Sequence, residues 1–280
     1  MAEIPFFKMH GAGNDFILID NREGHFSGRE QAVFARLCSR PLGLGADGLL
    51  LIEPGSEVDF VLRYYNADGR PAEMCGNGAR CGVWAAHRLG LCGRQARFRV
   101  FDRIYQARLE GPARVRLALG RASQVFSPDQ LQAVASVHPR LTPLGVWNTG
   151  VPHLVLHSQV PLEEINVQAL APRYRYHEQF NPAGVNVNFV VAQRKGVLRV
   201  RVYERGVERE TLSCGTGAVA CALAAHQAWG WPAPIHVVSE GGTLEVSFTG
   251  SGGETALTGP VQLVCRGWLN SEVGSPEPGE

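Results

Sequence analysis

The chain carries one short phrase twice, about half a chain length apart. The first copy, Cys75–Ala79, reads Cys-Gly-Asn-Gly-Ala, and the second, Cys214–Ala218, reads Cys-Gly-Thr-Gly-Ala. Each copy follows an apolar, strand-like stretch with a polar turn, and each precedes an alanine-rich run that favours a helix. Two matching strand–turn–cysteine–helix units predict a duplicated fold in which each half contributes one thiol.

The pattern of short strands and few long helices predicts the fold class. It favours an α+β fold with a mostly antiparallel sheet over a doubly wound parallel sheet. We expect an N-terminal half over residues 1–118, joined by the last strand near residues 260–270, and a C-terminal half over residues 119–259. Helical spacing predicts a helix over Leu162–Ala171. The tail 271–280 is rich in glycine, proline and glutamate, and we expect it to be disordered.

Composition and charge limit the cellular compartments and the binding partners that we expect for the chain. The formal net charge is +1, so bulk electrostatics predict neither a nucleic-acid partner nor an anionic membrane. The segment Met1–Lys8 lacks the features of a signal peptide, and no run approaches about 18 apolar residues. Seven cysteines without a secretion signal favour reduced thiols over a disulfide framework. We therefore expect a cytoplasmic protein.

The paired thiols, Cys75 and Cys214, are candidate catalytic residues. A thiol just before a helix meets unpaired N–H groups and the positive end of the helix dipole, which lower its pKa from about 8.5. Two such thiols close together would share one proton, because two thiolates repel each other. The thiolate would remove the α-proton from one face of a carbon and the thiol would return a proton to the other. An amino-acid racemase or epimerase needs this geometry.

The glycines of the phrase support an anion site. Gly76 and Gly78, with Gly215 and Gly217, let backbone N–H groups approach a bound carboxylate closely. A carboxylate held between two helix N-termini would have its developing enediolate charge stabilised in the transition state.

The other cysteines have a simpler interpretation as small hydrophobic residues of the core. This applies to Cys38, Cys92 and Cys265, and to Cys81 and Cys221 inside the two predicted helices. The spacings within each cysteine pair are too long for a structural zinc site, so we expect no metal.

Cofactor sites also find little support. The glycine pattern of Gly43–Gly48 matches a dinucleotide fingerprint, but an apolar strand follows it where a helix is required. Pyridoxal phosphate needs a Schiff-base lysine, and neither Lys8 nor Lys195 sits in a phosphate-cradling loop. We expect a mechanism without a cofactor.

Taken together, these motifs resemble the diaminopimelate epimerase family, over residues 6 to about 268. Several segments in the correct order form a specific signal, which one cysteine–glycine motif alone would not. The segments are Lys8–Phe16, Gly43–Gly48, Tyr65–Gly69, Met74–Cys81, Pro152–His153, Val185–Val187, Tyr203–Gly206 and Glu210–Ala218.

The resemblance implies a cofactor-independent enzyme that interconverts LL- and meso-2,6-diaminopimelate, for lysine and peptidoglycan biosynthesis. It implies two pseudo-symmetric α+β domains, each wrapped around a central helix, with the site in the cleft, and a homodimer. By the same resemblance, the base/acid pair is Cys75 and Cys214. The residues that bind the reacting carboxylate are Gly76, Asn77, Gly215 and Thr216, and those that hold the substrate are Asn14, Asn66, Asn186 and Arg205. Glu204 and His153 lie near the reacting amino group and the thiols.

Two departures from the family pattern concern the substrate. Val151 stands where many members have asparagine, and Gly48 stands where some have glutamine; both changes remove a side-chain contact to the ligand. The alternatives are a cofactor-independent racemase of proline, hydroxyproline or histidine, and a non-catalytic ligand-binding relative. Asn77 argues against the proline type, and the presence of both thiols argues against loss of catalysis.

Overall fold

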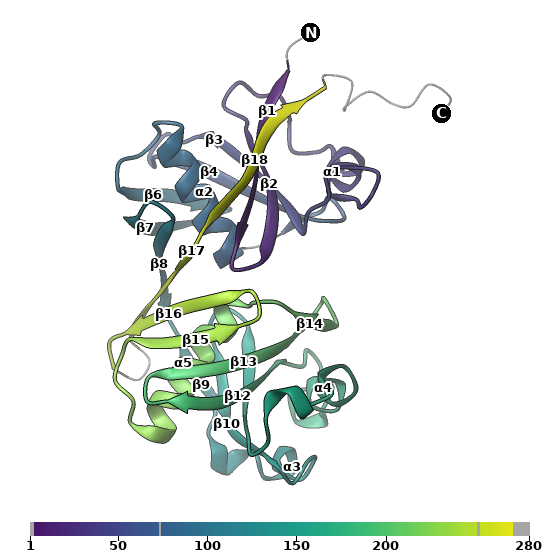
Figure 1. The fold of residues 1–280 in the computed structure, drawn as a ribbon, viewed down its shortest axis with the longest axis vertical. Helices are drawn as coiled ribbons and strands as arrows, with labels where there is room; N and C mark the ends of the chain where they lie inside the picture. Colours follow the sequence, from purple (N-terminus) through teal and green to yellow (C-terminus); the bar gives the residue numbers. More distant parts are fainter. Residues whose placement is uncertain (1–2, 73, 251–252, 271–280) are drawn as a thin grey trace. The chain divides into compact units, whose positions relative to one another are not determined.

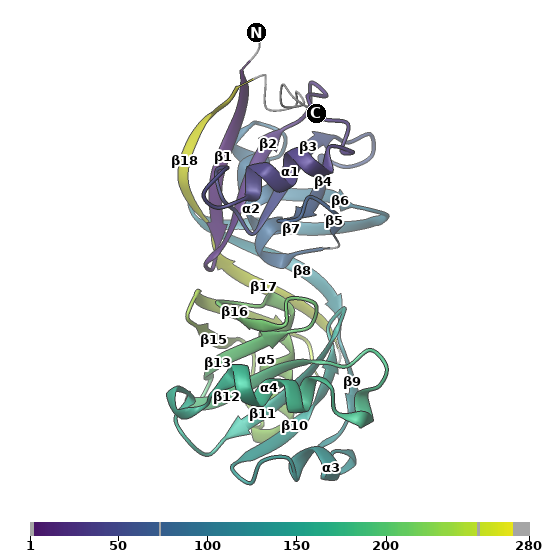
Figure 2. The same ribbon diagram turned by 90° about the vertical axis from the view of Figure 1, so that its right-hand side faces the viewer.

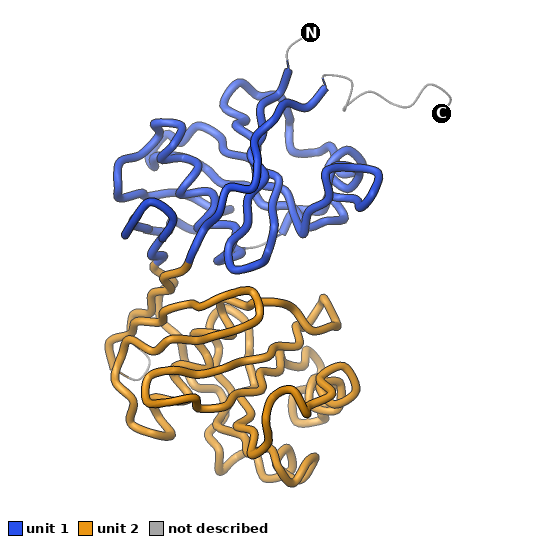
Figure 3. The backbone as a smooth tube through the Cα atoms, in the orientation of Figure 1, with its two compact units in different colours: residues 1–117, 260–280 blue, residues 118–259 orange. Residues whose placement is uncertain are grey.

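The computed structural model describes residues 3–72, 74–250 and 253–270 (Figure 1). Contacts divide the chain into two compact units, residues 1–117 with 260–280 and residues 118–259 (Figure 3). Unit 1 is therefore built from two separate stretches of sequence. The tail at 271–280, expected to be disordered, lies outside the described residues.

In unit 1 the strands pair in the order β18-β1-β2-β3-β4-β6-β7-β8. The pairs β2–β3 and β4–β6 are parallel and the other pairs are antiparallel. A short strand, β5, pairs with the end of β4. The bounds are β1 Ile4–Gly11, β2 Asn14–Asp20, β3 Gly48–Pro54, β4 Phe60–Asn66, β5 Pro71–Ala72, β6 Gln95–Val100, β7 Arg103–Gly111, β8 Arg114–Arg121 and β18 Gln262–Leu269.

Unit 2 repeats this topology. Its strands pair in the order β9-β10-β11-β12-β13-β15-β16-β17, with β11–β12 and β13–β15 parallel and short β14 on the end of β13. The bounds are β9 Ser123–Phe126, β10 Leu141–Asn148, β11 Pro152–Ser158, β12 Asn186–Arg194, β13 Val197–Glu204, β14 Arg209–Thr211, β15 Ile235–Ser239, β16 Gly242–Phe248 and β17 Glu254–Pro260.

Each unit has one helix at its centre. Helix α2 (Gly76–Arg88) contacts β1, β2, β3, β4 and β7, and helix α5 (Gly215–Trp229) contacts β10, β11, β12, β13, β15 and β16. In α5 every residue from Gly217 to Ala225 is buried, and most are alanine or glycine, so the strands can approach the helix closely from several sides. The prediction of two pseudo-symmetric α+β halves, each wrapped around a central helix, is confirmed.

The remaining helices lie on the outside of each unit (Figure 2). Helix α1 (Gln31–Cys38) follows β2 and contacts β3, while α4 (Val167–Arg175) follows β11 and contacts β12 and β13. Short helical segments complete the described chain: α3 Gln132–Ala135, η1 Pro128–Gln130, η2 Leu162–Glu164 and η3 Glu178–Phe180. None of the helices in the described ranges is both long and apolar enough to cross a membrane.

The predicted helix over Leu162–Ala171 is wrong in its bounds. The chain makes the short turn η2 and then starts α4 afresh at Val167. The reason is Asn166, whose side-chain oxygen accepts a hydrogen bond from the Ala169 N–H at 3.1 Å and caps the new helix.

Candidate active site

The first thiol of the repeat lies at the start of α2. Cys75 is the N-cap residue, with extended backbone dihedrals (φ −107°, ψ 116°), and it is half-buried. Its sulfur lies 3.5 Å from Oδ1 of Asn14, at the start of β2. An amide oxygen only accepts hydrogen bonds, so this contact favours the protonated thiol as donor.

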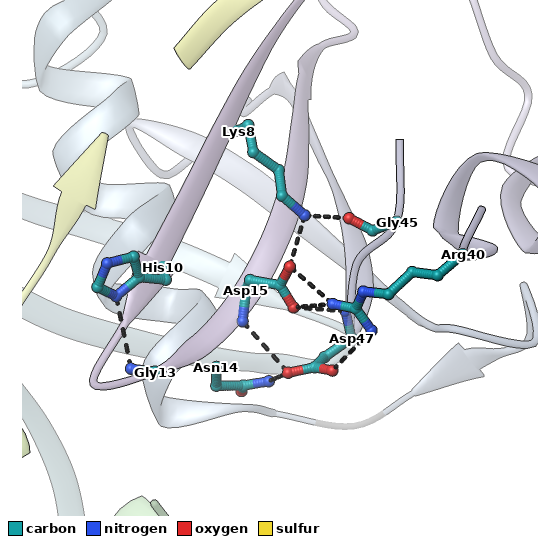
Figure 4. Close-up of polar contacts among 8 residues, drawn as sticks. All are labelled: Lys8, His10, Gly13, Asn14, Asp15, Arg40, Gly45 and Asp47. Carbon is teal, nitrogen blue, oxygen red and sulfur yellow. Dashed lines mark hydrogen bonds and ion pairs between the residues drawn. The ribbon is translucent and has the colours of Figure 1, made fainter. Parts of the chain in front are cut away.

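The orientation of the Asn14 amide is set from its other side. Nδ2 of Asn14 donates to Oδ2 of Asp47 at 2.8 Å (Figure 4). A carboxylate is an acceptor only, so the amide nitrogen must face Asp47 and the amide oxygen must face the sulfur of Cys75. Asp47 lies in the loop Gly43–Gly48, whose glycine pattern is followed by strand β3 rather than by the helix that a dinucleotide site requires.

Behind this pair lies a network of charged groups (Figure 4). Nζ of Lys8 lies 2.6 Å from Oδ2 of Asp15 and also bonds the carbonyl of Gly45. Arg40 bonds Asp15 at 2.7 Å and lies 3.6 Å from Asp47. Burial opposes ionisation of Asp15, but the hydrogen bonds and charges of Lys8 and Arg40 hold its pKa below the usual value. The network ties the β1–β2 turn to the Asp47 loop.

The first turn of α2 is braced by a buried arginine. Nη2 of Arg80 donates to Oδ1 of Asn77 at 2.7 Å, and Nη1 donates to the carbonyl of Gly76 at 3.2 Å. Burial lowers the pKa of Arg80 to about 10, which leaves the guanidinium charged at neutral pH. The side-chain oxygen of Asn77 is used inside the protein, so Asn77 offers a ligand its backbone N–H.

Asn66 differs from the other candidates because its side chain is exposed. It ends β4 and opens a turn in which its N–H bonds the carbonyl of Arg70 at 2.9 Å. Its carbonyl accepts from the N–H of Gly69 at 2.9 Å. The turn fixes the backbone of Asn66 and leaves its amide accessible to a ligand.

The second thiol lies at the start of α5 in the same local geometry. Cys214 is the N-cap residue, also extended (φ −126°, ψ 117°). Its sulfur lies 3.4 Å from Oγ1 of Thr216 and is hydrogen-bonded to the carboxyl group of Glu204. The Thr211 hydroxyl donates to the same carboxyl group.

The expectation that the helix N-terminus lowers the pKa is wrong for Cys214. Burial raises the pKa of its thiol well above the usual value, and the charge of Glu204 raises it further. Hydrogen bonds from Thr216 and the Gly217 N–H act in the opposite direction but are outweighed. Burial also raises the pKa of Glu204. In this state Cys214 is a thiol whose proton faces the partly buried carboxyl group of Glu204.

His153 contacts Thr216 and reaches Cys214 through it. It is fully buried on β11, with Nε2 3.0 Å from Oγ1 of Thr216 and Nδ1 3.2 Å from Nδ2 of Asn188. Burial, with a smaller effect of the Arg205 charge, lowers the pKa of His153 to about 3. The imidazole is therefore neutral at any physiological pH, and it acts through hydrogen bonds rather than charge.

Asn186 and Arg205 lie at neighbouring strand ends. Oδ1 of the buried Asn186 accepts from the backbone N–H of Arg205 at 2.8 Å, and its Nδ2 donates to the carbonyl of Pro152 at 3.0 Å. Asn186 thus holds the main chain on both sides of it. The Arg205 guanidinium forms no ion pair with any of the described residues and is half-buried, which suits it to grip a carboxylate.

The site residues therefore gather in two groups, one in each unit. Unit 1 brings Asn14 to Cys75, and unit 2 brings Glu204, Thr216 and His153 to Cys214. Three side chains that complete these groups were missed by the sequence analysis: Asp47, Asn188 and Thr211. Asp47 and Thr211 each lie inside a quoted family segment, so a search for polar residues within those segments could have found them.

The remaining cysteines lie as core residues, with one exception. Cys38, Cys81 and Cys221 are buried, and burial raises the pKa of Cys81 to about 12. Cys92 is partly buried. The prediction is wrong for Cys265, which is exposed, because it lies on β18, a strand on which the residues of both faces from Gln262 to Arg266 are exposed.

Comparison with known proteins places this geometry in context. The family model described as diaminopimelate epimerase matches residues 6–102 and 145–264. The diaminopimelate epimerase of Chlorobaculum tepidum is 40% identical over 93% of this chain and 99% of its own length. That of Aquifex aeolicus is 38% identical over 96% of this chain and 99% of its own.

Solved structures with lower sequence identity share the fold. A phenazine biosynthesis protein of the PhzF family from Bacillus anthracis superposes with a TM-score of 0.72 at 13% identity, covering 96% of this chain and 100% of its own. A probable proline racemase from Agrobacterium radiobacter gives a TM-score of 0.65 at 15% identity, covering 95% and 93%.

Proposed function

Because this chain belongs to the diaminopimelate epimerase family, we infer that it interconverts LL- and meso-2,6-diaminopimelate. The reaction inverts one α-carbon and serves lysine and peptidoglycan biosynthesis. The observation that carries the assignment is the match to the family over most of both units, with a thiol at the N-terminus of each central helix.

The two thiols carry out the proton transfers that invert the α-carbon. In one direction Glu204 takes the proton of the Cys214 thiol, and the resulting thiolate removes the α-proton of the substrate. The Cys75 thiol then gives a proton to the opposite face of the carbon and becomes a thiolate. Solvent restores the proton on Cys75 and removes the one on Glu204, so the net change is inversion alone. In the reverse direction Cys75 is the base.

The helix N-termini stabilise the charge that develops when the α-proton leaves. The backbone N–H groups of Gly76 and Asn77 in α2, and of Gly215 and Thr216 in α5, belong to the first turns, where N–H groups lack intrahelical partners. Donors aimed at the reacting carboxylate gain strength as it becomes an enediolate.

The residues that hold the substrate act at its non-reacting end. Arg205 takes the distal carboxylate bidentately, and the exposed amide of Asn66 binds a polar group of the same end. Asn14 is the exception, because its Oδ1 lies 3.5 Å from the sulfur of Cys75 and therefore beside the reacting carbon. Asn186 contributes indirectly, because its side chain fixes the backbone of Arg205. Val151 and Gly48 offer no polar side chain for this end of the substrate.

The decisive experiment is α-proton exchange in D2O with LL-diaminopimelate under reducing conditions. The native chain should place deuterium on one α-carbon and form the meso isomer, and Cys75→Ala and Cys214→Ala should each abolish net epimerisation. Cys81→Ala and Cys221→Ala, which alter buried thiols of the same two helices, serve as matched controls and should remain active. No exchange with this substrate but exchange with proline, hydroxyproline or histidine would assign the alternative racemase activity instead.

We also propose that the chain works as a homodimer in the cytoplasm. Two large apolar side chains on β18, Val264 (58% exposed) and Trp268 (64%), face outward and suit burial against a second copy. Analytical ultracentrifugation should give twice the chain mass for the native protein and a lighter species for Trp268→Glu. A native protein that sediments at the chain mass would exclude the homodimer.

A further inference from the structure

We propose that Asn188 is a positioning residue for Cys214: it holds the neutral imidazole of His153 in the tautomer that donates to Thr216, which turns the Thr216 hydroxyl proton toward the sulfur. The proposal rests on the function proposed above. It assigns a role to a residue outside the predicted site and makes the thiol of unit 2 dependent on a relay of three side chains.

The orientation of Asn188 is unambiguous. It lies fully buried on β12, and its Nδ2 is 3.0 Å from the carbonyl oxygen of Leu154 and 3.2 Å from Nδ1 of His153. A carbonyl oxygen only accepts hydrogen bonds, so the group that faces Leu154 must be the NH2 group. The second N–H of that group then donates to Nδ1 of His153.

The tautomer of His153 follows from this donor. A neutral imidazole carries one proton, and if Nδ1 accepts, that proton is on Nε2. Nε2–H then donates to Oγ1 of Thr216 at 3.0 Å. The imidazole is neutral because burial lowers the pKa of His153 to about 3. The charged side chain that acts on this pKa is Arg205, which lowers it further.

The last step of the relay reaches the sulfur. Since Oγ1 of Thr216 accepts from His153, its own proton is left to donate, and Sγ of Cys214 lies 3.4 Å away. A donor on sulfur favours the thiolate. It therefore supports Cys214 after Glu204 has taken the proton. In the opposite tautomer Nε2 would accept the Thr216 proton, and the sulfur would lose this donor.

The packing around Asn188 indicates that its amide is needed for hydrogen bonding and not only to fill space in the core. In the described part of the chain, its buried Oδ1 has no hydrogen-bond partner, which costs free energy that a leucine would avoid. Gly217 leaves the space for this oxygen, because a Cβ there would lie 2.5 Å from it. The amide is thus fixed between His153 and the first turn of α5.

The test begins with the 15N NMR signals of the histidine ring in the native protein, assigned by their loss in His153→Gln. We expect the Nε2–H tautomer, with Nδ1 unprotonated; the Nδ1–H tautomer in the native protein would overturn the proposal. This measurement needs no variant at Asn188 and no turnover, so it stands apart from the test of the proposed function.

The second arm uses Asn188→Asp, which keeps the size but offers Nδ1 an acceptor. We expect a proton on Nδ1, a higher midpoint pH for alkylation of Cys214, and a kcat lower by about 10- to 100-fold, as expected for loss of a hydrogen bond to a charged group, with KM nearly unchanged. Asn188→Leu should lower kcat similarly. Unchanged ring signals and an unchanged Cys214 midpoint in folded Asn188→Asp would contradict the relay.

The matched control is Asn166→Ala. Asn166 is also an asparagine of unit 2, but its side chain caps α4 by accepting from the Ala169 N–H. We expect this variant to lose thermal stability while the His153 signals and the alkylation of Cys214 stay as in the native protein. Equal changes in Asn166→Ala and Asn188→Asp would show that general destabilisation, not positioning, moves these readouts.

Discussion

Asn14 donates its amide to Asp47 across 2.8 Å, and this bond decides which end of the amide meets the sulfur of Cys75. The two residues are separated by most of a strand, a helix and a glycine-rich loop in sequence. Lys8 and Arg40 hold the loop against the β1–β2 turn through Asp15. In unit 1 the Asn14 amide oxygen is therefore a hydrogen-bond acceptor for Cys75, whereas in unit 2 the Thr216 hydroxyl is a donor to Cys214.

We expect Asp47→Ala to lower kcat/KM for diaminopimelate by about tenfold or more, because the Asn14 amide loses a hydrogen bond to a charged group and can rotate. Steady-state kinetics measure this loss. Asp20→Ala is the matched control, since Asp20 is likewise an aspartate near an arginine, Arg22 at 2.6 Å, but lies at the opposite end of β2 from Asn14. Equal effects of the two substitutions would remove the case for Asp47 as a positioning residue.

Glu204→Gln should lower the midpoint pH at which Cys214 is alkylated. The carboxylate raises the pKa of the Cys214 thiol through its charge and its hydrogen bond, so a neutral side chain makes the thiolate easier to form. The Cys214 peptide is followed by mass spectrometry after timed exposure to iodoacetamide. Glu210→Gln, on neighbouring β14 and paired with Arg201, should leave the midpoint in place. A rise in the midpoint for Glu204→Gln would contradict the assigned electrostatics.

His153 should make the free energy of unfolding depend on pH. Its pKa is about 3 in the folded chain and 6.5 in the reference state, so below pH 6.5 the unfolded chain binds a proton that the folded chain does not. Stability is therefore lost as pH falls from 6.5, by up to about 1.4 kcal/mol per pH unit, and the loss levels off near pH 3. The free energy of unfolding, measured by urea titration at several pH values in this range, should fall less steeply with falling pH for His153→Gln than for the native chain. Parallel slopes would mean that His153 is protonated in the folded state.

The fold and the thiols could be predicted from the sequence because the repeat encodes them locally. The phrase at Cys75 and Cys214 combines a cap position, close-approach glycines and an alanine-rich helix, and each is read from neighbours in sequence. The contacts of Asp47 and Asn188 join strands or loops distant in sequence, so no local pattern marks them. The pKa of Cys214 was mispredicted for the same reason: the helix N-terminus is local, but burial and Glu204 come from the tertiary fold.

The two copies of the phrase should respond differently to the same substitution at their second glycine. A Cβ on Gly217 would lie 2.5 Å from Oδ1 of Asn188, a fixed and buried group, whereas a Cβ on Gly78 would meet Phe16 and Leu50 at 3.3 and 3.4 Å. Alanine also favours a helix over glycine by about 1 kcal/mol. We expect Gly78→Ala to leave the melting temperature nearly unchanged and Gly217→Ala to lower it clearly. Thermal unfolding by circular dichroism compares them, and equal melting temperatures would show that Asn188 can move aside.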